Sequence, residues 1–218
     1  MNFSTDIIAN ELKVFESRFK ASVESPVPLL DRIMKYVVKT KGKQLRPMFV
    51  LLSAKLSGPV NPSTYRAASL VELLHTASLV HDDVVDESAE RRGFFSVYAL
   101  WKSKISVLVG DYLLGQAFKM MVETGSLECL RILSDAACII AEGEVLQLAV
   151  SQDTSTTEDA YLRVVGAKTA ALFSAAARVG GVISNRPRAE QEALESYGRN
   201  LGIAFQLVDD ALDYSGSK

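Results

Sequence analysis

A short acidic segment in the first half of the chain has the residue types and spacing of a cation site. It reads LLHTASLVHDDVVDES and contains His75, Asp82, Asp83 and Asp86. On a helix with about 100° per residue, His75, Asp82 and Asp86 lie within about 40° of one another, and Asp83 lies about 80° from His75. Carboxylates on one helix face repel one another, and a divalent cation between them removes that cost. The stripe therefore predicts a metal site, with a solvated acidic helix end as the alternative.

A second segment, FQLVDDALDYSG, repeats the same aspartate spacing much later in the chain. It contains Asp209, Asp210 and Asp213, and Gln206 lies at a similar helical angle. The recurrence favours a shared role, and we expect the two helix ends to form facing walls of one cavity. Oxygen ligands without His or Cys at ligand spacing indicate Mg²⁺, which keeps several waters and takes phosphate oxygens as further ligands. The predicted ligand is a phosphate or diphosphate.

Basic residues near these segments fit an anionic ligand. Lys43 and Arg46 lie at the start of a predicted helix, where the helix dipole also favours anions, and Arg91 and Arg92 follow the first acidic segment. Lys168 lies alone among Ala, Val and Leu, so a buried ammonium there would need an anionic partner. The alternatives are solvated helix ends for the two pairs and a lysine that reaches water along its helix.

The elements that must position these residues are helices. Apolar residues recur at three and four positions, alternating β-branched stretches are scarce, and the six prolines lie at boundaries. We predict an all-α fold in a single domain over residues 1–218. The predicted helices cover residues 4–22, 28–39, 46–57, 63–88, 96–100, 104–123, 126–150, 157–180 and 188–214.

Composition excludes several classes of protein. A net charge of -2 argues against nucleic acid as a partner, because phosphate-backbone binding needs a basic excess. Cys129 and Cys138 lie in apolar helical context, which predicts buried reduced thiols and a cytoplasmic location. The N-terminus lacks the pattern of a secretory signal, and no run approaches the roughly 18 apolar residues of a membrane span.

Seven segments together resemble the trans-isoprenyl diphosphate synthases, also called polyprenyl synthetases. They are GKQLRP, ELLHTASLVHDDVVDES, RRG, LVGDYLLGQAF, EGEVLQL, KTAALFSAA and FQLVDDALDYSG, in the family's order and spacing. The resemblance implies an isoprenoid-synthase-type helical bundle around a central cavity, and a homodimer. Typical members continue for roughly another hundred residues, so the chain resembles the N-terminal two thirds of a member and is expected to lack the C-terminal helices.

The resemblance also implies roles for individual residues. The metal ligands for Mg²⁺ would be Asp82, Asp86 and Asp209. Further catalytic residues would be Asp83, Asp210, Asp213 and Lys168. The allylic diphosphate would contact Arg91, Lys168, Thr169 and Gln206. Isopentenyl diphosphate would contact Lys43, Arg46, His75 and Arg92.

The expected reaction is Mg²⁺-dependent elongation of an allylic diphosphate with isopentenyl diphosphate. Departing pyrophosphate leaves an allylic cation that the isopentenyl double bond attacks, so no protein nucleophile is required. One alternative is an inactive diphosphate-binding or partner subunit of the same family. A terpene cyclase is disfavoured, because cyclases usually replace the second aspartate motif.

Small residues before the first aspartate predict a long product. Ser78 and Leu74 lie one and two turns below Asp82, respectively, on a similar helix face, and Ala77 adjoins Ser78. By resemblance, short-chain synthases carry an aromatic floor at the positions of Ala77 and Ser78. We therefore expect an octaprenyl-like quinone side chain, which would partition to a membrane. The alternative is that both residues are small because two helices pack closely there.

Overall fold

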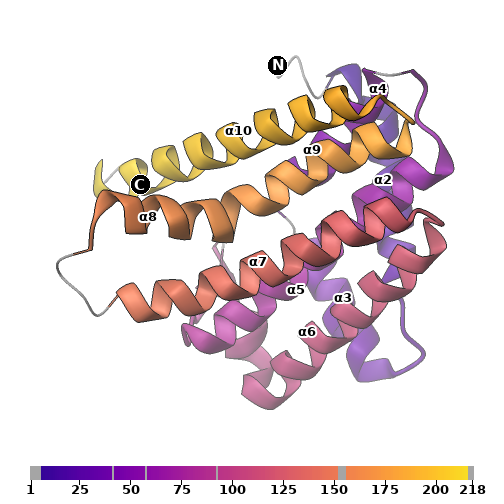
Figure 1. Cartoon of the computed structure of the whole chain (residues 1–218). Helices are drawn as coiled ribbons and strands as arrows, with labels where there is room; N and C mark the ends of the chain where they lie inside the picture. The colour runs from indigo at the N-terminus through magenta and orange to yellow at the C-terminus, as the bar shows by residue number, and fades with distance from the viewer. Residues whose placement is uncertain (1–5, 41, 57, 92, 152–155, 216–218) are drawn as a thin grey trace. The chain divides into compact units, whose positions relative to one another are not determined.

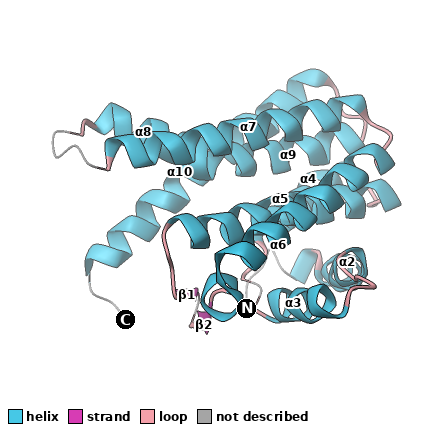
Figure 2. Ribbon diagram, turned by 90° about the horizontal axis from the view of Figure 1, so that it is seen from below, coloured by secondary structure: helices cyan, strands magenta, loops and turns pink. Residues whose placement is uncertain are grey.

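The computed structural model describes residues 6–40, 42–56, 58–91, 93–151 and 156–215 of the 218-residue chain. The described residues form the predicted all-α fold, to which one short hairpin is added (Figures 1 and 2). The elements are α2 (Ala9–Ser22), α3 (Pro28–Lys39), α4 (Leu45–Lys55), α5 (Pro62–Val85), β1 (Glu90–Arg91), β2 (Phe94–Phe95), α6 (Val97–Glu123), α7 (Leu127–Val150), α8 (Glu158–Val165), η1 (Gly166–Ala170), α9 (Ala171–Ile183) and α10 (Arg188–Ser215).

Local sequence signals begin several of these helices. Asn61 accepts from the backbone N–H of Thr64, whose hydroxyl accepts from the Asn61 N–H, so α5 starts with a reciprocal capping box. Ser96, Ser126 and Thr157 accept a backbone N–H at the starts of α6, α7 and α8. Each cap satisfies a donor that would otherwise lack a helical partner.

Backbone contacts divide the chain into two compact units, which we describe separately. The first unit comprises Met1–Leu51 and Val60–Gly125, and the second comprises Leu52–Pro59 and Ser126–Lys218. The first acidic segment belongs to the first unit and the second acidic segment to the second unit. The single domain over 1–218 stays a prediction.

The first unit is built around α5, which packs along α6 and also contacts α2. Leu70 and Leu73 of α5 and Leu113 of α6 are fully buried. In the second unit, α9 lies between α7 and α10 and packs against both (Figure 1). This packing places α8 and η1 next to α10.

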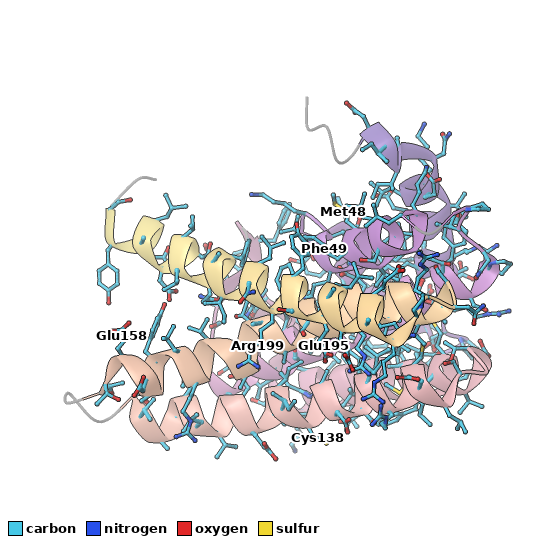
Figure 3. All side chains as sticks on the ribbon, turned by 45° about the horizontal axis from the view of Figure 1, so that its top comes forward. Met48, Phe49, Cys138, Glu158, Glu195 and Arg199 are labelled. Atoms are coloured by element: carbon cyan, nitrogen blue, oxygen red, sulfur yellow. The ribbon has the colours of Figure 1, made fainter. Side chains whose placement is uncertain are left out.

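A groove of about 1180 Å³ lies in the second unit between α7, α9 and α10. Arg178 of α9 spans it, pairing with Glu195 of α10 at 2.8 Å and with Glu128 of α7 at 3.1 Å. Glu195 and Arg199, labelled in Figure 3, line the groove from successive turns of α10. The ion pairs of Arg178 therefore link α9 to both neighbouring helices.

Three details differ from the sequence predictions. The hairpin of β1 and β2 was not predicted, and it pairs Arg91 with Phe94 across the turn. The predicted break between residues 100 and 104 is a kink at Lys102, whose φ is 68°, inside α6. The prediction that both thiols are buried is wrong for Cys138, which is exposed on α7, whereas Cys129 is buried. Burial raises the pKa of the Cys129 thiol.

Helix α6 bears on the predicted absence of a membrane span. Among the described helices, it is long and apolar enough to cross a membrane by length and composition, a test that core helices of soluble proteins also pass. It packs along α5 with one face.

Candidate functional site

The three aspartates of the first acidic segment lie in different environments at the end of α5. Asp82 is half-buried, Asp83 is buried with 3% of its surface exposed, and Asp86 is the exposed C-cap residue of the helix. The predicted separation of Asp83 from the Asp82 and Asp86 stripe agrees with this difference. Asp83 therefore faces the protein interior.

The buried carboxylate of Asp83 is held by Arg91 from the hairpin. Its Oδ1 accepts a hydrogen bond from Nε of Arg91 at 2.7 Å and forms an ion pair with Nη2 of the same guanidinium, also at 2.7 Å. The hairpin itself is anchored by the Tyr36 hydroxyl, which donates to the Phe95 carbonyl at 2.6 Å. Arg91, predicted to contact a diphosphate, is thus also the partner of an aspartate from the same cluster.

Replacing Arg91 by alanine is expected to lower the free energy of unfolding by roughly 2 to 3 kcal/mol. The buried Asp83 carboxylate would lose a hydrogen bond and its ion pair, and the expected cost is modest for a buried pair because Arg91 is 33% exposed. Urea unfolding followed by circular dichroism measures the change. Arg188→Ala, which breaks an exposed pair with Glu192, is the control and should cost about 1 kcal/mol or less. Equal losses in both variants would contradict the structural role of Arg91.

Two of the residues predicted to bind isopentenyl diphosphate lie together in the first unit. Nη1 of Arg46, in the first turn of α4, lies 3.0 Å from Nε2 of His75 on α5. Because a guanidinium only donates, Nε2 accepts, and the neutral ring then carries its proton on Nδ1. Lys43 is exposed shortly before α4, and Arg92 lies outside the described residues.

A chain of hydrogen bonds organises the second acidic segment on α10. The Thr169 hydroxyl donates to Oε1 of Gln206 at 2.7 Å, and Nε2 of Gln206 donates to Oδ1 of Asp210 at 2.8 Å. The Tyr161 hydroxyl donates to Oδ2 of the same aspartate. That hydrogen bond raises the pKa of Tyr161 to about 12, because the neutral phenol is the donor. Asp209 is exposed, as is Asp213.

Lys168 has an anionic partner, as a buried ammonium requires. Its Nζ lies 2.8 Å from Oε2 of Glu144 on α7, and about a quarter of each side chain is exposed. Glu144 lies in the segment EGEVLQL, which is part of the family resemblance, but no role was predicted for it. Tyr161 was missed entirely, because it lies 49 residues from Asp210 in the chain.

Lys168 and Thr169 lie in a π-helical turn, η1, between α8 and α9. Such turns insert an extra residue into a helix and are frequent at functional sites. Two glycines allow neighbouring helices to approach this turn. A Cβ on Gly143 of α7 would lie 2.7 Å from the Cβ of Ala167, and one on Gly202 of α10 would lie 2.6 Å from the Cα of Ala170.

The residues predicted to set product length differ in burial. Leu74 is 4% exposed and Ala77 is fully buried, whereas Ser78 is half-buried and donates to the His75 carbonyl at 2.9 Å. A small cavity of about 60 Å³ beside α5 is lined by other residues, including His75, Asp83 and Arg91. Burial of Ala77 favours close packing as the reason for its size, which leaves Ser78 as the better candidate.

The donor set of the acidic segments fits a hard divalent cation. Asp86, Asp209 and Asp213 offer exposed carboxylate oxygens at helix ends. Within the part of the chain that the structure describes, no three Asp, Glu, His or Cys side chains converge so as to hold a metal ion by themselves. Magnesium sites typically have only a few protein ligands, because Mg²⁺ completes its coordination with waters and phosphate oxygens.

Known proteins share this fold and sequence. The chain is 42% identical to the octaprenyl diphosphate synthase of Escherichia coli (strain K12), over 96% of this chain and 65% of that protein. A decaprenyl diphosphate synthase from Rhodobacter capsulatus superposes with a TM-score of 0.94 and 46% identity, over 98% of this chain and 66% of that chain. A polyprenyl synthase from Caulobacter crescentus, solved with calcium and isoprenyl diphosphate, has a TM-score of 0.94 and 42% identity, over 98% and 65%.

The fold and these similarities define an all-α protein of the isoprenoid synthase class. The family model described as polyprenyl synthetase matches residues 27–218. The chain therefore belongs to the polyprenyl synthetase family, and it spans about two thirds of the length of the relatives it matches.

Proposed function

We propose that this chain carries the catalytic residues of a long-chain trans-prenyltransferase. The enzyme would condense isopentenyl diphosphate with an allylic diphosphate to form an octaprenyl-like polyprenyl diphosphate. The observation that carries the proposal is the ordered second acidic segment, in which Thr169, Gln206 and Asp210 form one hydrogen-bond chain. The similarity to an octaprenyl and a decaprenyl diphosphate synthase supports a long-chain product. A cytoplasmic location stays a prediction.

Mg²⁺, with Asp82, Asp86 and Asp209 as its protein ligands, would neutralise the charge that develops on departing pyrophosphate. Lys168 and Arg91 would add positive charge next to the allylic diphosphate. Thr169 and Gln206 would orient the same group by hydrogen bonding.

Arg46 and His75, with Lys43, would hold isopentenyl diphosphate. The C–O bond of the allylic substrate breaks, and the isopentenyl double bond forms the new C–C bond. The proton then lost from carbon passes to the released pyrophosphate. Exclusion of water prevents capture of the cation.

Incubation with isopentenyl diphosphate, farnesyl diphosphate and Mg²⁺ tests the proposal. After removal of phosphate, chromatography should resolve a long all-trans prenol whose formation stops on addition of a chelator. Absence of any product, or a cyclic hydrocarbon, would overturn the proposal. The first outcome would indicate an inactive binding subunit, and the second a cyclase.

We further propose that the chain forms a homodimer through α6. One face of this helix, about 100° wide, carries exposed apolar side chains, namely Val107, Leu108, Phe118 and Val122. Leu113 and Ala117 lie on the opposite face and are buried. Gly115 lies on the same exposed face, with open space where a Cβ would be. A glycine within an exposed apolar stripe allows a second helix to approach closely. Such a stripe is typical of a protein interface.

Leu108→Glu is expected to shift the protein from dimer to monomer in size-exclusion chromatography with light scattering. Leu108 is 62% exposed on α6. In a two-fold symmetric dimer the substitution would bury two carboxylates at the interface, and burial of unpaired charges disfavours association. Val14→Glu, which changes an exposed valine on α2, is the control and should remain dimeric. A monomeric unsubstituted chain would refute the proposed interface.

A further inference from the structure

Asp210 differs from its neighbours in the second acidic segment because both of its carboxylate oxygens accept hydrogen bonds. Oδ1 accepts from Nε2 of Gln206 at 2.8 Å, and Oδ2 accepts from the Tyr161 hydroxyl. Asp210 is half-buried, whereas Asp209 and Asp213 are exposed. Two donors on opposite oxygens fix the plane of this carboxylate, since rotation about its side chain would break both bonds.

The two donors come from different parts of the second unit. Gln206 lies one turn before Asp210 on α10, and its amide orientation is fixed because Oε1 accepts from the Thr169 hydroxyl of η1. Tyr161 lies on α8 and reaches Asp210 across 49 positions of the chain. The last turns of α10 are thus tied to α8 through Asp210 and to η1 through Gln206.

We propose that Tyr161 is a positioning residue of the second acidic segment. By holding Asp210, it fixes the end of α10 so that the exposed carboxylates of Asp209 and Asp213 keep one orientation toward a metal-bound diphosphate. Asp210 then serves as an anchor of the segment. This inference rests on the proposed function, because it assigns the positioning to the diphosphate site of that reaction.

The C-terminal end of a helix needs such a tie because its last carbonyls lack helical partners and the end frays. The residues around Asp209 and Asp213 on α10 are mostly exposed, so packing alone restrains them weakly. A hydrogen bond from a neutral phenol to a carboxylate is charge-assisted and stronger than a neutral one. It also leaves the negative charge of Asp210 in place.

Tyr161→Phe tests the proposal, with Tyr214→Phe as the matched control. Tyr214 follows Asp213 directly, and its ring is 94% exposed. Calorimetric titration with Mg²⁺ in the presence of inorganic pyrophosphate should show about tenfold weaker binding in Tyr161→Phe, as expected for loss of a hydrogen bond to a charged group. Helix content should be unchanged, and the control should bind like the unsubstituted chain.

A double-mutant cycle with Asp210→Asn shows whether Tyr161 acts through Asp210. In the Asp210→Asn background, Tyr161→Phe should weaken binding by less than about twofold, because the contact is already altered. A full tenfold effect in that background would overturn the inference. So would unchanged binding in Tyr161→Phe alone.

Failure of the inference can be told from failure of the proposed function. If the unsubstituted chain binds magnesium pyrophosphate with the predicted Tyr161 dependence but forms no prenyl product, the proposed reaction is wrong and the positioning role stands. If prenyl transfer occurs and Tyr161→Phe binds normally, only the positioning role is wrong. Absence of magnesium pyrophosphate binding by the unsubstituted chain would overturn both.

Discussion

Alanine at Asp82 or at Asp209 is expected to lower the turnover number by roughly a thousandfold or more. Each substitution removes a carboxylate that we propose as a Mg²⁺ ligand, so the loss falls on charge stabilisation in the transition state. Asp82 is half-buried and Asp209 is exposed, and neither change removes core packing. Steady-state kinetics with saturating Mg²⁺ measures the loss, and circular dichroism should show nearly unchanged helix content.

Asp135→Ala is the control for these two variants. Asp135 is an exposed aspartate of α7 that lines the groove of the second unit, and none of the residues proposed as ligands lines that groove. It should keep turnover near that of the unsubstituted chain. Near-normal turnover in either Asp82→Ala or Asp209→Ala would show that the two acidic segments do not share one reaction step.

Ser78→Phe is expected to shorten the prenyl product by whole isoprene units. Ser78 lies one turn before Asp82 on α5 and is half-buried, and we propose that the prenyl tail passes beside it. An aromatic ring there would block the tail without changing an aspartate. Chromatography of the dephosphorylated products compares the two length distributions.

Ala77→Phe is the matched comparison for Ser78→Phe. Ala77 is fully buried, so the same ring would overpack the interior of the first unit and cost about 1 to 3 kcal/mol of stability. We expect a lowered melting temperature for Ala77→Phe and a shortened product for Ser78→Phe. Identical product lengths before and after Ser78→Phe, or an unsubstituted enzyme that stops at a short chain, would disprove the proposed floor.

The sequence predicted the helices well where local chemistry determines their ends. Residues 63–88 were predicted as one helix, and α5 covers Pro62–Val85 because Asn61 and Thr64 form a capping box before it. The offset of Asp83 from the Asp82 stripe followed from helical geometry alone. The need of Lys168 for an anionic partner followed from the apolar residues around it, and Glu144 meets that need.

Features that depend on tertiary contacts were not predictable in the same way. No local signal distinguishes the π turn at Gly166–Ala170 from a regular helix, because its extra residue is accommodated by neighbouring helices. Arg91 was predicted to bind a phosphate group. Its ion pair with Asp83 depends on the hairpin, and the sequence around Phe94 and Phe95 gave no signal for that hairpin. Tyr161 reaches Asp210 only because α8 lies beside α10.

The close approach of α7 and α10 to η1 limits which substitutions this protein tolerates at two glycine positions. Alanine is ordinarily the mildest replacement in a helix, yet at Gly143 and Gly202 its methyl group would overlap atoms of Ala167 and Ala170. These overlaps involve backbone and short side chains, which cannot rotate away. Two residues that carry no functional group therefore constrain how closely α7 and α10 approach the turn that carries Lys168 and Thr169.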